Sequence, residues 1–578
     1  MTSLVDAESV LAIDIGSLNT RALLFDVVDG QYHFIAASSA PTTAAAPFND
    51  IGEGVHRVLS RLQDITGRSL IAGDARLLIP TQADGSGVDR LALSCSAGGD
   101  IKILTMGLLD EVSLQSVQRL AGTTYAREVE TIGLNDRRKL ETQLDAILQA
   151  RPDVILLAGG TEKGATRSVL KLADLIAMAC RVLPRQERPV VLYCGNGVIA
   201  KRIKETIERE TILVVAPNIR PTIDQEDLAP AETYLARIVA KLRIFQLSGM
   251  DNLTAIASTT PLPSAYALGR MMRFSSELSG ISKSTLGVDL GSAATVLSVA
   301  TAGYLQSSVC RSLGMGASLE AALQQVRIED VARWVPYDLS EGDIRDTLYQ
   351  KSRFPASLPL TPETLAIEHA MAREILRMAV LRMLERWPGM NLSFERVFVS
   401  GATLAQAATP AQRLMIALDG LQPVGINVFM LDPYGLSQAL GTIAGINTLL
   451  PAQIIESGAY ENLGTVICPV SEARPGATIL RVKITYEDNT ESHLEIKQGS
   501  LVSLPIRNGQ TAHLEVDVLH GTVLDPCLPR LRRFRITGGL CGAVVDARGR
   551  PVELPADPQK RSVQLQRWMR ILEERRSA

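Results

Sequence analysis

Two short stretches of this chain combine an aspartate, a glycine and two hydroxyl side chains at identical spacing, D-[IL]-G-S-x-x-T. The first copy consists of Asp14, Gly16, Ser17 and Thr20, and the second of Asp289, Gly291, Ser292 and Thr295. Glycine lets the backbone approach a ligand closely, and N–H groups and hydroxyls can surround an anion. One accidental turn would not explain two copies, so the repeat favours a pair of phosphate-binding turns.

Each copy lies between two apolar stretches of alternating pattern, which predicts a β-hairpin with the motif in its turn. Mg²⁺ prefers carboxylate and phosphate oxygens, so opposed hairpins would suit a magnesium–nucleotide complex with Asp14 and Asp289 near the metal. The plainer interpretation is a pair of tight hairpins whose hydroxyls bond their own backbone. Arg21, just after the first turn, could contact phosphate or be a solvated arginine at a strand end.

Two further stretches fit a nucleotide site. Residues 397–407, "VFVSGATLAQA", predict a buried strand that ends at Gly401 and leads into a helix, so that a purine or ribose could lie against the glycine. An ordinary strand–turn–helix junction is the alternative. From Ile426, a strand and a Pro433-containing turn precede a helix of small residues, including Gly441, which permits close packing such as a hinge between half-domains needs.

Several other chemistries lack their motifs. The sequence contains no G-x-x-x-x-G-K-[ST], no G-x-G-x-x-G at a strand–helix junction, no H-E-x-x-H and no G-x-S-x-G. The seven cysteines are scattered and form no C-x-x-C pair, which is typical of reduced thiols. "DVLHGT" around His520 does not match the D-x-H-x-x-G spacing of a cobalamin-ligating domain.

Composition predicts a multidomain cytoplasmic protein. The 578 residues are 46% hydrophobic and 21% charged, and the net charge of −3 gives no sign of nucleic-acid binding. The amino terminus lacks the layout of a signal peptide. The uncharged run from Pro433 to Ile455 has the length of a membrane span, but polar residues and prolines interrupt it, which favours a buried core helix and no membrane partner.

The two hairpins are too far apart for one half-domain. Between them, apolar runs alternate with helical segments, which predicts a small parallel α/β module, and after Pro451 short β runs predict an antiparallel unit. A final amphipathic helix over 559–575 is expected to dock on the protein's own body. The predicted units are half-domain I (1–126), the inserted module (127–246), half-domain II (247–450) and a β-rich C-terminal domain (451–578).

The motifs "AIDIGSLNT", "GVDLGSAAT", "VFVSGATLA" and "GLSQALGTIAG" resemble the phosphate-1, phosphate-2, adenosine and connecting motifs of the actin-like ATPase superfamily. Further stretches, including "RPDVILLAGGTEKG" and "PVVLYCGNGVIA", are similar to the MutL (GlmL) family associated with glutamate mutase. The resemblance implies an α/β fold: a duplicated actin-like ATPase with ribonuclease H-like half-domains.

The resemblance also implies a function: an ATPase that reactivates an adenosylcobalamin-dependent mutase, its protein partner. Both turns with Arg21 would hold the phosphates of ATP, both aspartates would face Mg²⁺, and Gly401 would lie near the adenosine. Ala402 and Val296 depart from the superfamily pattern, at a glycine and an acidic position respectively. A small-molecule kinase of the same superfamily and a non-catalytic actin-like scaffold are the alternatives.

Overall fold

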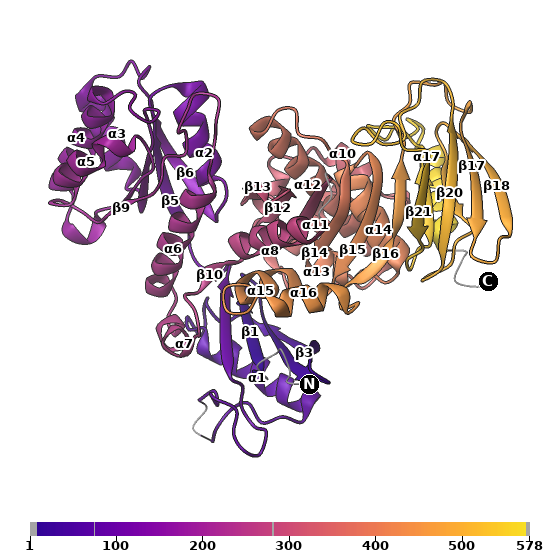
Figure 1. The fold of residues 1–578 in the computed structure, drawn as a ribbon, viewed down its shortest axis with the longest axis horizontal. Helices are drawn as coiled ribbons and strands as arrows, with labels where there is room; N and C mark the ends of the chain where they lie inside the picture. The colour runs from indigo at the N-terminus through magenta and orange to yellow at the C-terminus, as the bar shows by residue number, and fades with distance from the viewer. Residues whose placement is uncertain (1–7, 74–75, 280–282, 574–578) are drawn as a thin grey trace.

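The structure is a computed structural model that describes residues 8–73, 76–279 and 283–573. In these residues the strands form four sheets. Figure 1 shows half-domain I at the bottom, the inserted module at the upper left, half-domain II in the centre and the C-terminal region at the right.

Half-domain I is built on a five-stranded sheet with the order β10-β4-β1-β2-β3. Its strands are β1 (Val10–Ile15), β2 (Asn19–Val28), β3 (Gln31–Pro41), β4 (Arg90–Cys95) and β10 (Leu262–Pro263). β1 pairs antiparallel with β2 and parallel with β4. β1 is buried along its whole length, and helix α1 (Gly52–Thr66) packs its apolar face into the same core. The predicted first hairpin is therefore confirmed as β1–β2.

Half-domain II repeats this pairing. Its sheet has the order β13-β12-β11-β14-β15-β16-β22-β19, and β11 pairs antiparallel with β12 and parallel with β14. The first five strands are β11 (Ser284–Leu290), β12 (Thr295–Thr301), β13 (Tyr304–Cys310), β14 (Phe394–Ser400) and β15 (Gly425–Asp432). The second hairpin and the duplicated actin-like fold are thus confirmed.

Helices of half-domain II enclose the largest apolar core. They are α9 (Leu319–Leu323), α10 (Ile328–Ala332), α11 (Glu341–Arg353), α12 (Pro362–Arg386), α13 (Ala402–Ala405) and α14 (Pro410–Leu421). The long helix α12 begins with a capping box at Thr361 and Thr364, which pairs two backbone N–H groups, and with a proline in its first turn, which has no N–H to satisfy.

The inserted module is a parallel α/β sheet with the order β6-β5-β7-β8-β9, as the sequence pattern predicts. Its strands are β5 (Ile101–Met106), β6 (Ala126–Ile132), β7 (Val154–Leu157), β8 (Val190–Tyr193) and β9 (Leu213–Val215). Its helices are α2 (Gln115–Ala121), α3 (Leu140–Ala150), α4 (Arg167–Val182), α5 (Ala200–Ile207) and α6 (Ala229–Gln246). The sheet begins at Ile101, earlier than the predicted limits of 127–246, because β4 and β5 are both buried apolar strands and composition does not separate them.

Two helices cross between the half-domains. α8 (Ser264–Ser279) follows β10, α15 (Leu436–Ile443) follows β15, and the two pack closely in one apolar cluster. A Cβ at Gly441 would lie 1.9 Å from the carbonyl oxygen of Ala267, so this crossing requires glycine. The predicted close packing of the small-residue helix is confirmed. α15 and α16 (Leu449–Glu456) are the helices of the uncharged run, and no helix in the described ranges is long and apolar enough to span a membrane.

The C-terminal region has two parts. β16 (Glu461–Cys468), β19 (Leu501–Leu504) and β22 (Ala543–Asp546) extend the sheet of half-domain II, whereas β17 (Thr478–Tyr486), β18 (Glu491–Lys497), β20 (Thr511–Val518) and β21 (Arg533–Thr537) form a separate antiparallel sheet. The last helix, α17 (Pro558–Glu573), buries Trp568 and Leu572 in the core of half-domain II, as predicted. Residues 574–575 of the predicted helix lie outside the described residues.

Candidate functional site

The two motif turns have the same backbone geometry. The N–H of Gly16 donates to the carbonyl of Asn19 at 3.0 Å, and the N–H of Gly291 donates to the carbonyl of Ala294 at 3.0 Å. A Cβ at Gly16 would lie 2.6 Å from the Asn19 oxygen, and one at Gly291 would lie 2.8 Å from the Ala294 oxygen. Both turns therefore need glycine for the same steric reason.

Each aspartate is oriented by a serine from the neighbouring parallel strand. Ser94 stands beside Asp14 in the β1–β4 register and donates to its Oδ1 at 2.6 Å. Ser400 stands beside Asp289 in the β11–β14 register and donates to its Oδ1 at 2.9 Å. Ser264, at the start of α8, adds a bond of 2.7 Å to Asp14 Oδ1. The arrangement of aspartate and serine is thus duplicated together with the fold.

The hydrogen bonds of both aspartates leave one carboxylate oxygen available. In the described part of the chain, Oδ2 of Asp14 and Oδ2 of Asp289 accept no hydrogen bond from the protein. Removal of Asp289 from bulk water raises its pKa, while the nearby Arg21 guanidinium and the Ser400 hydroxyl act in the opposite direction. Two carboxylates that each present a free oxygen are suited to water or a cation between them.

Arg21 adds positive charge beside the aspartates. It stands opposite Asp14 in the β1–β2 register, and its guanidinium lies near the backbone of Gly435 at the start of α15. Within the described ranges it forms no ion pair, although its charge lowers the pKa of Asp289. An arginine that lines a cavity and forms no ion pair among the described residues can accept an anionic ligand.

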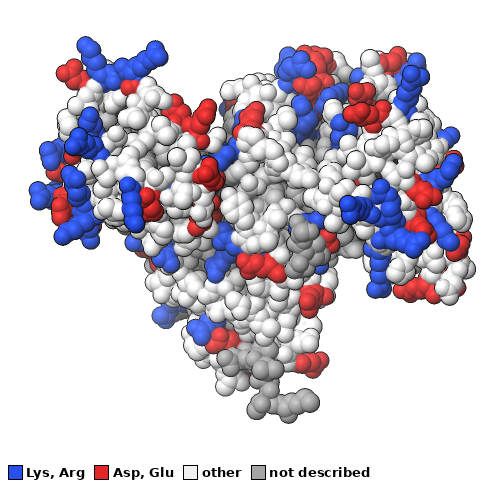
Figure 2. All heavy atoms as spheres, turned by 45° about the horizontal axis from the view of Figure 1, so that its top comes forward, with Lys and Arg blue, Asp and Glu red and all other residues white. Residues whose placement is uncertain are grey.

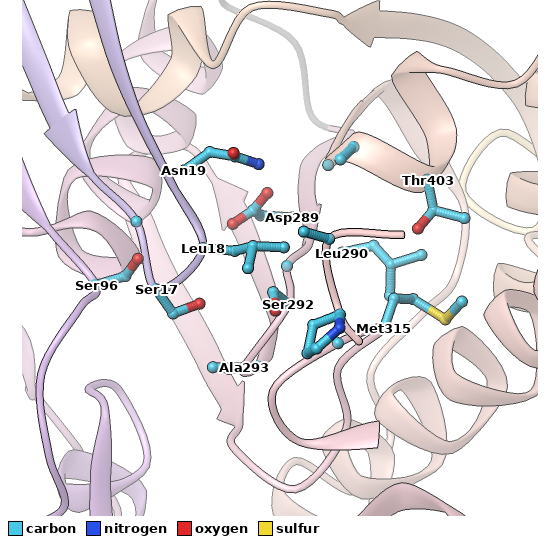
Figure 3. Close-up of a pocket in the computed structure, with 18 of the residues that line it drawn as sticks. Ser17, Leu18, Asn19, Ser96, Asp289, Leu290, Ser292, Ala293, Met315 and Thr403 are labelled. Atoms are coloured by element: carbon cyan, nitrogen blue, oxygen red, sulfur yellow. The ribbon is translucent and has the colours of Figure 1, made fainter. Parts of the chain in front are cut away.

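A cavity of about 270 Å³ lies between the two hairpins, close to the lower end of the roughly 300–1,000 Å³ of small-molecule sites. Figure 3 shows Ser17 of half-domain I facing Ser292 and Asp289 of half-domain II across it. Eight predicted site residues line it: Asp14, Gly16, Ser17, Arg21, Asp289, Gly291, Ser292 and Gly401.

Thr20 and Thr295 do not line the cavity. Both are buried, with the Thr20 hydroxyl bonded to that of Thr42 at 2.9 Å and the Thr295 hydroxyl donating to the carbonyl of Leu313 at 2.7 Å. These bonds attach each hairpin to the segment that lies beside it. The geometry therefore places both hydroxyls inside the protein, away from the groups that would meet a phosphate.

Gly401 forms the far wall of the cavity. Its φ of +115° suits glycine, and a Cβ there would lie 2.2 Å from the carbonyl of Leu290, at the end of β11. Beyond it the lining consists of Thr403, Gln406, residues 355–359 and a little-exposed ion pair between Lys351 and Glu368, at 3.1 Å. The two motif turns and this mixed wall thus lie at different parts of one cavity.

Several site residues were not predicted from the sequence. Ser94 is the residue before the last in β4 and Ser400 is the last residue of β14. Each follows three apolar residues, in "LALS" and "VFVS", and that shared pattern is the one signal that could have identified them. Ser264 and the pair of Lys351 and Glu368 carry no such signal. Tyr125 also lines the cavity although it belongs to the inserted module.

The donor set can be tested against a resident metal ion. No group of three or more His, Cys, Asp or Glu that could hold a metal occurs among the described residues. Mg²⁺ in nucleotide sites is held by one or two carboxylates with phosphate oxygens and waters. Asp14 and Asp289, each with a free Oδ2, fit that pattern and would not form an all-protein metal site.

The duplicated sheets and the cavity between their hairpins define a protein with the actin-like ATPase fold. The chain belongs to the MutL protein family, whose model matches residues 10–458.

Among individual proteins, the chain is 24% identical over 295 residues to Protein MutL of Clostridium tetanomorphum, a match that spans 50% of this chain and 57% of that protein. Two solved structures are similar at low scores. Component A of (R)-2-hydroxyglutaryl-CoA dehydratase from Acidaminococcus fermentans is 9% identical, with a TM-score of 0.28 and coverage of 75% of this chain and 96% of that one. Xylulose kinase from Bifidobacterium adolescentis is 12% identical, with a TM-score of 0.28 and coverage of 78% and 93%.

Proposed function

We propose that this protein binds ATP with Mg²⁺ between its two hairpins and uses the nucleotide to reactivate a cobalamin-dependent mutase. The observation that carries the nucleotide site is the duplication of the aspartate, the glycine turn and the orienting serine on both sides of one cavity. Membership of the MutL family supports the mutase as the partner.

The residues have separate roles in this proposal. The backbone N–H groups of the two turns and the hydroxyls of Ser17 and Ser292 would surround the terminal phosphates, with Arg21 balancing their charge. Asp14 and Asp289 would orient the waters of the metal through their free oxygens. Bound Mg²⁺ supplies positive charge to the phosphate oxygens. Gly401 would give the adenosine close access to the backbone.

Cleft closure would transmit the nucleotide state. A ligand that touches both hairpins binds the closed arrangement better than an open one and shifts the population toward it. In this proposal the two half-domains would change their angle at the crossing of α8 and α15, which pack together in one apolar cluster. A change of that angle alters the surface offered to a protein partner, which is what a reactivating protein requires.

The nucleotide site is tested by titrating the full chain with ATP, with and without Mg²⁺. Asp14→Ala combined with Asp289→Ala is expected to abolish the magnesium-dependent part of ATP binding. Loss of a residue that only hydrogen-bonds to a metal ligand lowers metal affinity by roughly 10–100-fold, and the double variant should lose more than that. Asp174→Ala, at an exposed aspartate on α4, is the matched control and should bind normally. Unchanged binding in the double variant would refute the site.

The partner is tested with inactivated glutamate mutase and adenosylcobalamin. Addition of the protein with ATP should restore mutase activity, and the mutase should raise the rate of ATP hydrolysis. Equal hydrolysis with and without the mutase, together with no recovery of its activity, would contradict the reactivating role. Transfer of phosphate to a sugar or acid without any protein partner would instead favour a kinase.

A further inference from the structure

Tyr125 brings the inserted module into the proposed nucleotide site. It lies between α2 and β6, at the amino-terminal edge of the module's sheet, and it lines the cavity between the hairpins. Only 7% of it is exposed, and burial together with the charges of Asp289 and Asp14 raises its pKa well above the usual range. A tyrosine hydroxyl is protonated at physiological pH and can donate a hydrogen bond.

The ring of Tyr125 lies in an apolar cluster to which both half-domains contribute. From half-domain II the cluster includes Ala294 and Val296 of the second hairpin and Leu268 of α8. Movement of this hairpin would therefore displace the tyrosine, and the tyrosine would displace the segment that leads into β6.

The segment before Tyr125 is held in place on the same side. The carbonyl of Gly122 accepts from the N–H of Val309 in β13 at 2.9 Å, and the guanidinium of Arg386 lies against Gly122, where an added Cβ would require it to move. Arg119 donates to the carbonyl of Arg386 at 2.9 Å. These contacts attach the amino-terminal edge of the module to half-domain II. The chain itself enters the module from half-domain I, as Figure 1 shows.

We propose that the hydroxyl of Tyr125 donates a hydrogen bond to the terminal phosphoryl group of the bound nucleotide, which makes the inserted module a sensor that distinguishes ATP from ADP. The inference rests on the proposed nucleotide site. The phosphoryl group brings negative charge next to two carboxylates, and the metal that arrives with it offsets that charge. The neutral hydroxyl beside the carboxylates can then donate a hydrogen bond to a phosphoryl oxygen. ADP lacks that group and leaves the hydroxyl without this partner.

The test compares the affinity for a non-hydrolysable ATP analogue with that for ADP, both with Mg²⁺, in the full chain. Tyr125→Phe removes only the hydroxyl and is expected to weaken the ATP analogue by roughly tenfold to a hundredfold, with little change for ADP. Tyr266→Phe is the matched control: its hydroxyl bonds Thr233 of α6 at 3.0 Å, away from the cavity, and both affinities should stay as in the wild type.

Hydrogen exchange of the unmodified protein gives a readout that needs no variant. The ATP analogue, but not ADP, should slow amide exchange in residues 122–132, and Tyr125→Phe should remove that difference. An unchanged ratio of the two affinities, or equal protection by both nucleotides, would overturn the inference and leave the nucleotide site standing. If the wild type binds neither nucleotide, the proposed function fails as well.

Discussion

At the scale of single residues, Asp289 has an electrostatic cost that its proposed role explains. Because burial raises its pKa in the folded state, ionised Asp289 favours the unfolded state near neutral pH, where an unfolded aspartate with a pKa of about 3.9 is charged without penalty. Such a cost is typical of groups kept for function and not for stability.

Asp289→Asn is therefore expected to raise the Tm of the nucleotide-free protein at pH 7.5 while it weakens magnesium-dependent ATP binding. In the wild type, the stabilisation that a raised carboxyl pKa provides is present below the pKa of the unfolded state and is lost as pH rises through the pKa of the folded state. The gain in Tm from asparagine should therefore shrink toward pH 4. The rise should be about 1 °C for each kcal/mol relieved, because the shift becomes smaller as more residues unfold together. Thermal melts at both pH values measure it, with Asp174→Asn as control, and a lower Tm at pH 7.5 would contradict the prediction.

Whether a residue of the site could be predicted depends on how close in the sequence it lies to the residues it contacts. Asp14, Gly16 and their counterparts in the second copy were predictable because each motif lies within one hairpin. Ser94 and Ser400 meet the aspartates only through parallel strand pairing over 80 and 111 positions, which no short pattern encodes. Tyr125 enters from another module, and its position depends on how three units pack.

At the scale of secondary-structure elements, the crossing of α8 and α15 links the two half-domains beside the cavity. Ser264, the first residue of α8, bonds Asp14 at the cavity, and Arg21, which lines the cavity, lies near Gly435 at the start of α15. Small residues allow the close approach, and the sequence predicts that property from Gly441 and its neighbours. The partner helix was not predictable, because α8 lies more than 150 positions earlier in the chain.

Gly441→Ala should disturb this crossing. The added Cβ would lie 1.9 Å from the backbone oxygen of Ala267, which cannot move aside as a flexible side chain would. We expect a loss of about 1–3 kcal/mol in the free energy of unfolding, typical of overpacking, and weaker ATP binding. Urea unfolding measures the first effect. Gly99→Ala is the control, since a Cβ at that position would have no heavy atom within 4 Å, and equal midpoints for both variants would refute the tight crossing.

At the scale of the whole molecule, strand pairing and charge unite the C-terminal region with half-domain II. β16, β22 and β19 continue its sheet, so a boundary near residue 450, predicted from a change in composition, falls within a continuous core. Composition indicates the type of secondary structure in a segment and not the sheet that its strands join.

On the face seen in Figure 2, basic and acidic side chains are interspersed over both the inserted module and the C-terminal region.

A buried ion network connects the C-terminal region to two helices. Asp419 of α14 pairs with Arg373 of α12 at 2.9 Å and with Arg548 at 2.8 Å, and Arg548 also pairs with Asp546 of β22. The Arg548 guanidinium lies 4.6 Å from the ring centre of Trp568 in α17. The charges are almost fully buried, so each arginine depends on its carboxylate partners.

Asp419→Asn should therefore destabilise the C-terminal region and half-domain II together. Removing one member of a buried pair costs about 3–5 kcal/mol, because the remaining charge stays desolvated and unpaired. Glu495→Gln breaks the ion pair with Arg481 on the antiparallel sheet, where both side chains are more than half exposed, and should cost at most about 1 kcal/mol.

Urea unfolding followed by tryptophan fluorescence compares the two variants, because Trp568 stacks on Arg548. If Asp419→Asn shifted the midpoint no more than Glu495→Gln does, the network would not join these regions. A single cooperative transition that moves to lower urea would show that they unfold as one unit.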